Sequence, residues 1–275
     1  MRDRIPSYFQ LQKYNVTPED VVKLYFHCEP EVIQPKVIVT PYWHVERFSG
    51  NADSVTTVFE DAVYQLEYNG QLITFIRTGI GAPQTGDAIV ALGCTPCERI
   101  VFTGSVGGLS SSMEIGELIV TEKSICGDGF SRYLDADVQT KDCFFQPVEP
   151  DLDLTKCFDN VASEHCQRES VPLHRGNIFS TDSIIAQFFR LDYIVENFDC
   201  IGIEMETAAL FKAAKLVGIK AAALLQLSDV IPTSKSLFSG RTEEDMERRR
   251  YIREKVLIKA IFDSLTVCED NDTVR

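Results

Sequence analysis

The sequence predicts an α/β domain, and three observations carry that prediction. The segment from Cys200 to Asp229 is patterned as strand, helix, strand, with an apolar run at each end and an Ala-rich helical stretch that Gly218 ends. The second apolar run, Ile219 to Leu227, is long enough for a strand covered on both faces. The 275 residues suffice for one buried core, and contents of 44% hydrophobic and 10% aromatic residues exclude a disordered chain.

We expect one domain over residues 1–275, with a lead-in segment at 1–35 and a frayed tail at 269–275. The other strands are short apolar or alternating runs, expected at 36–40, 62–68, 71–78, 99–103, 117–122 and 172–179. Asn69-Gly70, between two of these runs, is a strong hairpin signal. Gly104 to Gly108 predicts a glycine-rich loop whose N–H groups form a nest for an anion or a hydroxyl.

Helical periodicity and capping residues predict helices at 17–26, 84–92 and 151–169, and a long one from Thr242 onwards. That last helix begins with the capping pair Thr242 and Asp245. Its expected apolar face consists of Met246, Ile252, Val256, Ala260, Ile261 and Leu265. The segment before it, Ile231 to Gly240, is rich in Pro, Ser and Gly and predicts a flexible flap.

Charge and hydropathy exclude two classes of partner. The net charge of −14 argues against a nucleic acid, because affinity for its phosphates comes from clustered Lys and Arg. No stretch reaches the roughly 18 continuous apolar residues of a spanning helix. The first ten residues, MRDRIPSYFQ, contain no apolar core of a secretion signal. We therefore expect neither a nucleic-acid partner nor a membrane anchor.

Nine cysteines, an odd number spread through apolar segments, indicate a reducing compartment, and the cytoplasm is the default expectation. Cys94 and Cys97 have the spacing of a redox motif. They lie where a helix gives way to a strand, however, and not at a helix start, so the structural interpretation is favoured. No second Cys pair and no His pair has the spacing of metal ligands, so neither a metal nor another cofactor is implied.

Three acidic residues follow two of the buried strands. Glu204 and Glu206 come after Cys200 to Ile203, and Asp229 follows Ile219 to Leu227. Ligands of open α/β sheets bind at the carboxyl ends of strands. Each acid alone is also a common way to charge or cap a helix N-terminus. All three together, in buried surroundings, need partners that offset their desolvation, and a polyhydroxylated ligand is such a partner.

These residues carry a family resemblance. The segment IGIEMETAAL resembles the Glu-Met-Glu signature of the nucleoside phosphorylase and nucleosidase superfamily, and LSDV resembles the Ser-Asp of its purine-acting members. RTGIGAP, FTGSVGGL and RGNIFSTDS are similar to further family segments in the same order, so the likeness covers roughly Thr17 to Leu265. It implies a three-layer α/β/α domain around a mixed, partly barrel-like sheet. It also implies cleavage of a nucleoside N-glycosidic bond.

The resemblance assigns roles residue by residue. Glu206 would bind the ribose hydroxyls with Met205 packed on the sugar, and Asp229 would act as general acid toward N7 of a purine. The base would contact Ser228, Ile184 and Ile185, whose places lack the family's stacking aromatic, although Phe188 or Phe189 lies nearby in sequence. The nucleophile would be held near Gly81, Gly104 and Ser105.

The choice of nucleophile depends on Glu46. Related phosphorylases hold phosphate with arginines, and the matching positions here are Glu46, Phe59 and Phe102. Related nucleosidases have a Glu where Glu46 falls, which activates water, so we expect hydrolysis. Two alternatives stay open at this stage: Glu46 is a solvated partner of Arg47, or Arg47, Arg77 or a neighbouring subunit's arginine supplies the charge for phosphate.

Three interpretations of the whole protein follow. The first is a purine nucleosidase, the second a phosphate-dependent nucleoside phosphorylase of purine or uridine type that releases ribose 1-phosphate, and the third a catalytically inactive nucleoside-binding relative. Retention of both Glu206 and Asp229 argues against the third. The resemblance also implies a homodimer or a hexamer, because sites in this family are completed across a subunit interface. The expected small-molecule partners are therefore a nucleoside and, for a phosphorylase, phosphate.

Overall fold

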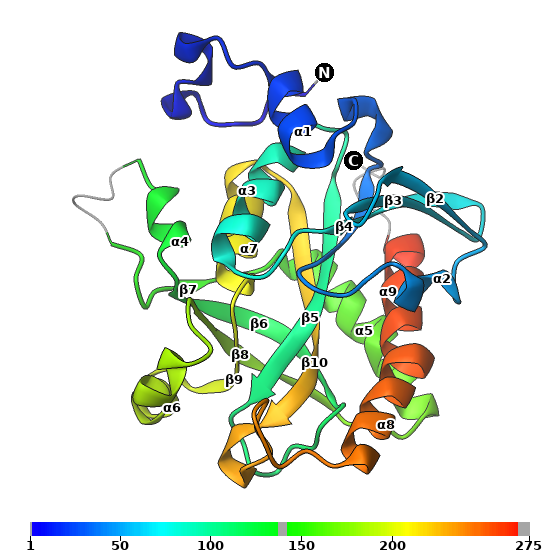
Figure 1. Ribbon diagram of the computed structural model, residues 1–275, viewed down its shortest axis with the longest axis vertical. Coiled ribbons are helices and arrows are strands. Elements are labelled where there is room, and N and C mark those ends of the chain that lie inside the picture. The colour runs from blue at the N-terminus through cyan, green and yellow to red at the C-terminus, as the bar shows by residue number, and fades with distance from the viewer. Residues whose placement is uncertain (1, 137–141, 269–275) are drawn as a thin grey trace.

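The computed structural model describes residues 2–136 and 142–268, so the predicted tail at 269–275 lies outside the described residues. One sheet runs through the molecule in the order β10-β6-β8-β9-β5-β1-β4-β3-β2, with β7 (Pro147–Val148) paired to β6 (Figure 1). Within these described ranges, no helix is long and apolar enough to cross a membrane.

Five strands of the sheet close into a ring. They are β5 (Arg99–Gly108), β6 (Leu118–Gly127), β8 (Leu173–Thr181), β9 (Cys200–Glu204) and β10 (Lys220–Val230). β10 pairs antiparallel with β6, β6 and β8 are parallel, β8 and β9 are parallel, and β9 is antiparallel to β5. The parallel pairing of β5 with β10 closes the ring. The mixed, partly barrel-like sheet that the resemblance implied is therefore confirmed.

Four further strands extend the sheet from β5. They are β1 (Lys36–Thr40), β4 (Gln71–Arg77), β3 (Val63–Tyr68) and β2 (Ser54–Phe59). The predicted β3–β4 hairpin is confirmed, and Asn69 and Gly70 have φ of 51° and 71°, as a tight hairpin turn requires. β2 was not predicted, because its side chains are mostly exposed and give no inward-outward alternation.

Helices cover both faces of the sheet, as the three-layer prediction requires (Figure 1). Val37 and Val39 of β1 pack into the cluster that includes α1 (Pro18–Phe26), α3 (Ala82–Leu92) and α7 (Thr207–Leu216). Ile38 points the other way, into the cluster of α5 (Leu152–Arg168) and α9 (Ile258–Val267). The shorter helices are α2 (Glu46–Ser49), α4 (Phe130–Tyr133), α6 (Leu191–Phe198), η1 (Ser7–Phe9), η2 (Leu11–Tyr14), η3 (Pro30–Val32), η4 (Ala186–Arg190) and η5 (Ile231–Thr233).

The C-terminal helical run consists of α8 (Glu243–Ile252), the π-helical turn η6 (Arg253–Leu257) and α9. The predicted capping box is confirmed: the Asp245 amide donates to Thr242 Oγ1 at 3.1 Å, and the Thr242 amide donates to Asp245 Oδ2 at 2.8 Å. The predicted apolar face is buried from Ile252 onwards, but Met246 is 37% exposed. That part of the prediction was wrong because Met246 lies on the solvent side of α8.

The glycine-rich segment before Leu109 is strand and not loop. β5 continues through Gly108, because Ser105 pairs with Gln226 of β10 and Gly107 pairs with Ile203 of β9. A Cβ at Gly108 would lie 2.8 Å from a side-chain atom of Leu227, so glycine allows the close approach of these strands. The predicted nest is therefore wrong, since these residues belong to the ladders.

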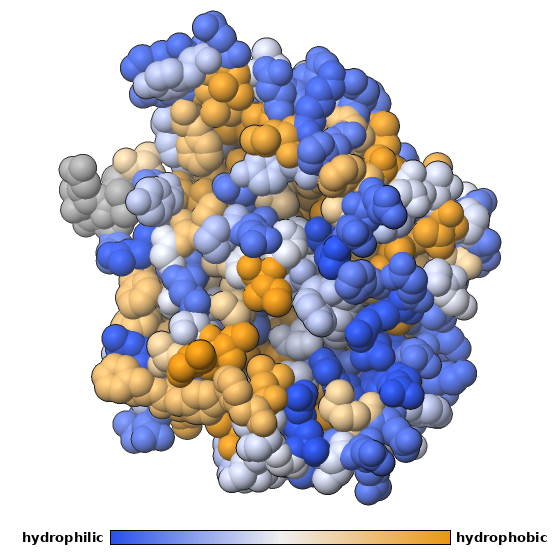
Figure 2. Space-filling view, in the orientation of Figure 1, coloured by the Kyte–Doolittle hydropathy of each residue, from blue (hydrophilic) through white to orange (hydrophobic). Residues whose placement is uncertain are grey.

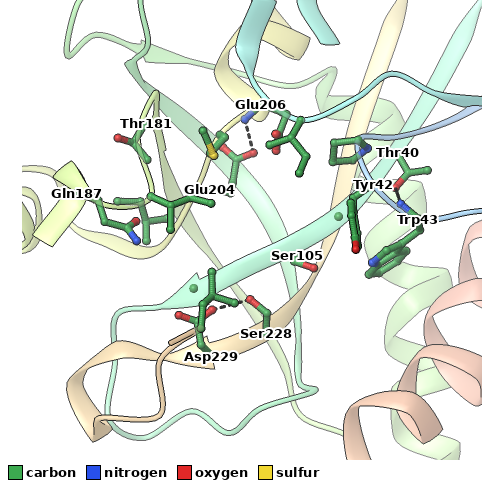
Figure 3. A pocket seen from close by; sticks show the side chains of 18 of the residues that line it. Thr40, Tyr42, Trp43, Ser105, Thr181, Gln187, Glu204, Glu206, Ser228 and Asp229 are labelled. Atoms are coloured by element: carbon green, nitrogen blue, oxygen red, sulfur yellow. Dashed lines mark hydrogen bonds between the residues drawn. The ribbon is translucent and has the colours of Figure 1, made fainter. Parts of the chain in front are cut away.

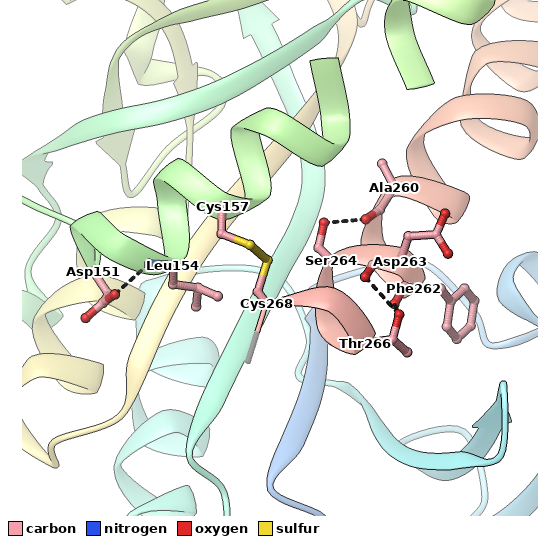
Figure 4. The surroundings of a disulfide bond; sticks show 9 residues. All are labelled: Asp151, Leu154, Cys157, Ala260, Phe262, Asp263, Ser264, Thr266 and Cys268. Carbon is pink, nitrogen blue, oxygen red and sulfur yellow. Dashed lines mark hydrogen bonds between the residues drawn. A yellow bond between two sulfur atoms is a disulfide. The ribbon is translucent and has the colours of Figure 1, made fainter. Parts of the chain in front are cut away.

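One pair of the nine cysteines is bonded. Cys157 of α5 and Cys268, just after α9, form a disulfide across a sequence separation of 111 (Figure 4). The sequence favoured a reducing compartment and predicted no disulfide framework, but packing of α5 against α9 brings these two cysteines together. The other seven cysteines are free thiols, and Cys94 and Cys97 are buried among them.

The disulfide should stabilise the fold by restricting the unfolded chain. Closing a loop of this length is worth about 5 kcal/mol in the chain-entropy model, so we expect Cys157→Ser to lower the free energy of unfolding by about 2–5 kcal/mol. Urea unfolding of oxidised protein measures the effect, with Cys28→Ser as the matched control for loss of a free thiol. Equal stability of Cys157→Ser and the oxidised wild type would contradict it.

Candidate active site

A cavity of about 280 Å³ opens where β1, β9 and β10 end and β5 passes beneath them. Glu206 lies on one side of it, Ser228 and Asp229 on the opposite side, and Ser105 between them (Figure 3). Tyr42 and Trp43 line a third side and Thr181 and Gln187 a fourth. Four segments that are far apart in the sequence therefore meet at one cavity.

Glu206 is placed by the turn between β9 and α7, where it is the N-cap residue. Its side chain is 4% exposed, and its Oε1 accepts a hydrogen bond of 2.7 Å from the Gly81 amide. Burial, followed by repulsion from Glu204, raises the pKa of Glu206 to about 8. A ligand with hydroxyl donors would favour its charged form, because hydrogen bonds to a carboxylate stabilise that form.

Glu204 stabilises the same turn through hydrogen bonds. Its carboxylate accepts from Ser180 Oγ at 2.5 Å, Thr207 Oγ1 at 2.7 Å, the Glu206 amide at 2.7 Å and the Thr207 amide at 2.8 Å. Burial raises the pKa of Glu204 even against these four donors. The network fixes the backbone that carries Glu206, so the two carboxylates have different tasks.

Asp229 lies on the wall of the cavity opposite Glu206. It is 3% exposed, and its Oδ1 accepts a hydrogen bond of 2.6 Å from Ser228 Oγ. Burial raises the pKa of Asp229, against the hydrogen bond from Ser228 and the charges of Arg241 and Arg249. A carboxyl group in such surroundings can carry a proton into a reaction, which suits a general acid.

Positive charge lines the side of the cavity next to Ser105. Arg249 of α8 donates from Nη2 to Ser105 Oγ at 2.6 Å, and Arg47 of α2 also lines the cavity. The buried Nε of Arg249 has no acceptor within the described part of the chain. Burial, with Arg253, Arg241 and Arg47 nearby, lowers the pKa of Arg249 to about 10, which still leaves it charged at neutral pH. The wall therefore offers unused donors to an anion.

Several contacts hold these arginines in place. The guanidinium carbons of Arg47 and Arg253 lie 6.0 Å and 5.8 Å from the centre of the buried Trp43 ring. Gln226 Nε2 donates to the Arg249 carbonyl at 2.8 Å. A Cβ at Gly116 would lie 3.0 Å from the Arg249 Cα, so this glycine lets α8 lie close to the sheet.

Figure 2 shows the surface over α8 as hydrophilic and that over α6 as hydrophobic.

Most of the predicted site residues line the cavity. Those that do are Glu206, Met205, Ser228, Asp229, Ile184, Gly104 and Ser105. Gly81 lies behind Glu206 and contacts it through its amide. Ile185 is 76% exposed and does not line the cavity. Neither Phe188 nor Phe189 lines it, and both are exposed.

Glu46 is not at the cavity. It is the first residue of α2, and its side chain is exposed, whereas the next residue, Arg47, lines the cavity. The reason is packing: Val45 and Phe48 turn into the core, which leaves Glu46 on the solvent side. The structure therefore does not place Glu46 at the cavity as expected, and Arg47, weighed as an alternative, lines it.

Sequence reasoning missed Arg249, Trp43 and Gln187 as cavity residues. Gln187 is 8% exposed although its neighbours Phe188 and Phe189 are exposed. The run Arg248 to Arg250 was the available signal for Arg249, but helical periodicity alone does not say which of the three faces the sheet.

Comparison with known proteins identifies the protein family to which this fold and site belong. A family model described as the phosphorylase superfamily matches residues 37–259, and the chain belongs to that superfamily. Its members are phosphorylases or nucleosidases that cleave glycosyl bonds, so the protein is an enzyme. The predicted resemblance is confirmed.

Three relatives illustrate the likeness. The DeoD-type purine nucleoside phosphorylase of Mycoplasma genitalium is 22% identical over 218 residues, which cover 79% of this chain and 88% of the relative. Uridine phosphorylase from Vibrio fischeri has a TM-score of 0.70 at 24% identity, covering 85% of this chain and 92% of that one. AMP nucleosidase from Bacteroides thetaiotaomicron has a TM-score of 0.70 at 18% identity, covering 93% and 97%.

The buried Glu206 should make stability depend on pH. Its pKa of about 8 lies above the ordinary value of 4.5, so the folded protein binds this proton more tightly than the unfolded chain does. That stabilisation is complete below about pH 4.5 and is lost as pH rises through about 8. Glu206→Gln cannot ionise, so its melting temperature should rise relative to wild type between pH 5 and pH 9.

Thermal unfolding at both pH values tests this expectation, with the exposed Glu98→Gln as control. A difference between Glu206→Gln and wild type that stays constant across the range would contradict the raised pKa.

Proposed function

We propose that the protein cleaves purine nucleosides with inorganic phosphate, releasing the free base and ribose 1-phosphate. The observation that carries this proposal is the Arg249–Ser105 hydrogen bond of 2.6 Å, which points positive charge into the cavity that Glu206 and Asp229 also line. The proposal replaces the expectation of hydrolysis. The glutamate that would activate water lies outside the cavity, and arginines lie inside it.

The charge of the wall suits a phosphate dianion. Burying a doubly charged anion without cations is very costly, so a phosphorylase needs several positive groups. Arg47 and Arg249 line the cavity, and Arg253 and Arg241 lie near enough to lower the pKa of Arg249. Phe102, at a position where related phosphorylases carry an arginine, is fully buried in the core. In this protein the arginines therefore come from α2 and α8.

The ribose would lie between the two walls. Glu206 would accept hydrogen bonds from the 2′ and 3′ hydroxyls, and Met205 would pack against the ring. As the bond to the base lengthens, positive charge develops on the sugar, and the carboxylate of Glu206 stabilises it more strongly than in the ground state. A phosphate oxygen would then form the bond to C1′ as the bond from C1′ to the base breaks.

The base would leave as a neutral purine. Asp229 would donate a proton to N7, so that the electron pair of the broken bond stays on a neutral ring. Ser228, which hydrogen-bonds Asp229, orients the carboxyl group. Gln187 and Ile184 line the same part of the cavity as Thr181, and the Gln187 amide can donate to and accept from the edge of the base.

The names of the relatives support this choice without deciding it. The curated relative from Mycoplasma genitalium is named a purine nucleoside phosphorylase, as is that from Mannheimia succiniciproducens, which is 24% identical over 212 residues. Structural neighbours include a uridine phosphorylase and an AMP nucleosidase, so the superfamily contains both kinds of nucleophile. The arginines in the cavity are the reason to favour phosphate here.

The phosphate site can be tested through Arg249. We expect base release from inosine or adenosine to require phosphate, and Arg249→Met to raise the KM for phosphate by about 10- to 100-fold, because a charged hydrogen bond is worth roughly 1.5–3 kcal/mol. The exposed neighbour Arg250 supplies the matched control, Arg250→Met, which should leave that KM unchanged. Base release at full rate in phosphate-free buffer would instead support hydrolysis.

The general acid can be tested with a substrate that needs no proton. Asp229→Asn should lower kcat for inosine by ~10²–10⁴-fold. Activity on 7-methylguanosine should be largely retained, because its N7 already carries a methyl group and its base leaves without protonation. An equal loss on both nucleosides would contradict the acid role of Asp229 and would indicate a role in positioning.

A further inference from the structure

Two free cysteines lie side by side outside the active-site cavity. Cys126 is near the end of β6, and its amide and carbonyl bond to Gln146 at 3.0 Å and to Phe145 at 2.6 Å. The Gln146 amide donates in turn to the Cys143 carbonyl at 2.9 Å. These backbone bonds bring Cys143 next to Cys126, where the two thiols affect each other's titration.

A lysine completes the cluster. Lys212 of α7 forms an ion pair of 2.6 Å with Asp135 and lines the same surface cavity as Cys143. Cys126 is fully buried, whereas Cys143 is half-buried and lines a surface cavity of about 580 Å³ together with Lys212 and Lys215. A solute can therefore reach Cys143, and Cys126 lies behind it.

These surroundings distinguish Cys143 from the other thiols. The hydrogen bond from Cys126, with help from Lys212, lowers the pKa of Cys143 to about 7, so much of it is thiolate at neutral pH. Burial raises the pKa of Cys94 to about 11 and of Cys97 to about 12, so that pair stays protonated despite its redox-motif spacing. Cys28 is half-buried like Cys143, but its pKa is raised to about 11.

We propose that Cys126 and Cys143 form a reversible redox site that reacts with hydrogen peroxide. The Cys143 thiolate attacks one peroxide oxygen, so an S–O bond forms as the O–O bond breaks; Cys143 becomes a sulfenic acid, and the hydroxide that leaves becomes water after proton transfer. The Cys126 thiol then attacks the sulfenic sulfur, the S–S bond forms, and a second water leaves. Two thiols and one hydrogen peroxide thus give one disulfide and two waters, with two electrons passing from sulfur to oxygen.

The site adjoins the active-site network through β6. Cys126 pairs with Ser180 of β8, and Ser180 donates to Glu204, which holds the turn of Glu206. Ser124, two residues before Cys126 on the same face of β6, donates to Thr207 Oγ1 at 2.7 Å. Oxidation of the pair would therefore act next to the groups that hold the ribose-binding carboxylate.

Mass spectrometry tests the proposal without relying on catalytic activity. The whole protein is treated with hydrogen peroxide, its remaining thiols are alkylated, and the peptides are mapped. We expect a disulfide between Cys126 and Cys143 that dithiothreitol reverses. In Cys126→Ser, Cys143 should stop at the sulfenic acid, which dimedone traps. Lys212→Gln should slow alkylation of Cys143 by iodoacetamide at pH 7 at least several-fold.

Cys28→Ser is the matched control and should form the disulfide like wild type. The wild-type protein also gives a comparison that needs no variant, because iodoacetamide should alkylate Cys143 faster than Cys28. Absence of a Cys126–Cys143 disulfide after peroxide, or equal alkylation rates for Cys143 and Cys28, would overturn the proposal whatever reaction the active-site cavity performs.

Discussion

The active site depends on burying two carboxylates next to each other. Glu204 and Glu206 are 5% and 4% exposed, and each raises the cost of ionising the other. The cost is reduced because Glu204 receives four hydrogen bonds, from Ser180, Thr207 and two amides, which offset part of its desolvation. Glu206 accepts a hydrogen bond from the Gly81 amide and, among the described residues, has fewer donors than Glu204, so it is the group left to bind a ligand.

Positive charge lies across the same cavity from these carboxylates. Arg47 and Arg249 line the wall that Ser105 also contributes to, and repulsion from Arg253, Arg241 and Arg47 helps to lower the pKa of Arg249. A wall with excess positive charge is unfavourable when empty and becomes favourable when an anion occupies it. Trp43 gives the arginines a rigid aromatic surface, and the Gln226 amide fixes the backbone of Arg249.

The closed ring of strands is what joins these two walls. β5 pairs with β10 on one side and with β9 on the other, so the ends that carry Asp229 and Glu204 meet over Ser105. Glycines at 107 and 108 make the crossing possible, since a Cβ at either would press on Asp229, Ile203 or Leu227. The same closeness turns the glycine-rich segment from an expected loop into the floor of the cavity.

The sequence by itself determined the elements whose signals are local. The strand–helix–strand segment, the Asn69-Gly70 hairpin and the Thr242 capping box were predictable because periodicity, turn chemistry and capping involve residues a few positions apart. The acids at the strand ends were predictable for the same reason. Only the tertiary structure decided which neighbour of the pair Glu46 and Arg47 faces the cavity, because core packing of Val45 and Phe48 sets that rotation.

Long-range contacts were likewise decided only by the folded chain. Arg249 meets Ser105 across 144 positions, and Cys157 meets Cys268 across 111, so no pattern within one segment reports either contact. The continuation of β5 through Gly108 also depends on partners from β9 and β10. Local chemistry thus determined which elements form and which acids they carry, whereas the pairing of distant strands and helices determined the cations that face those acids.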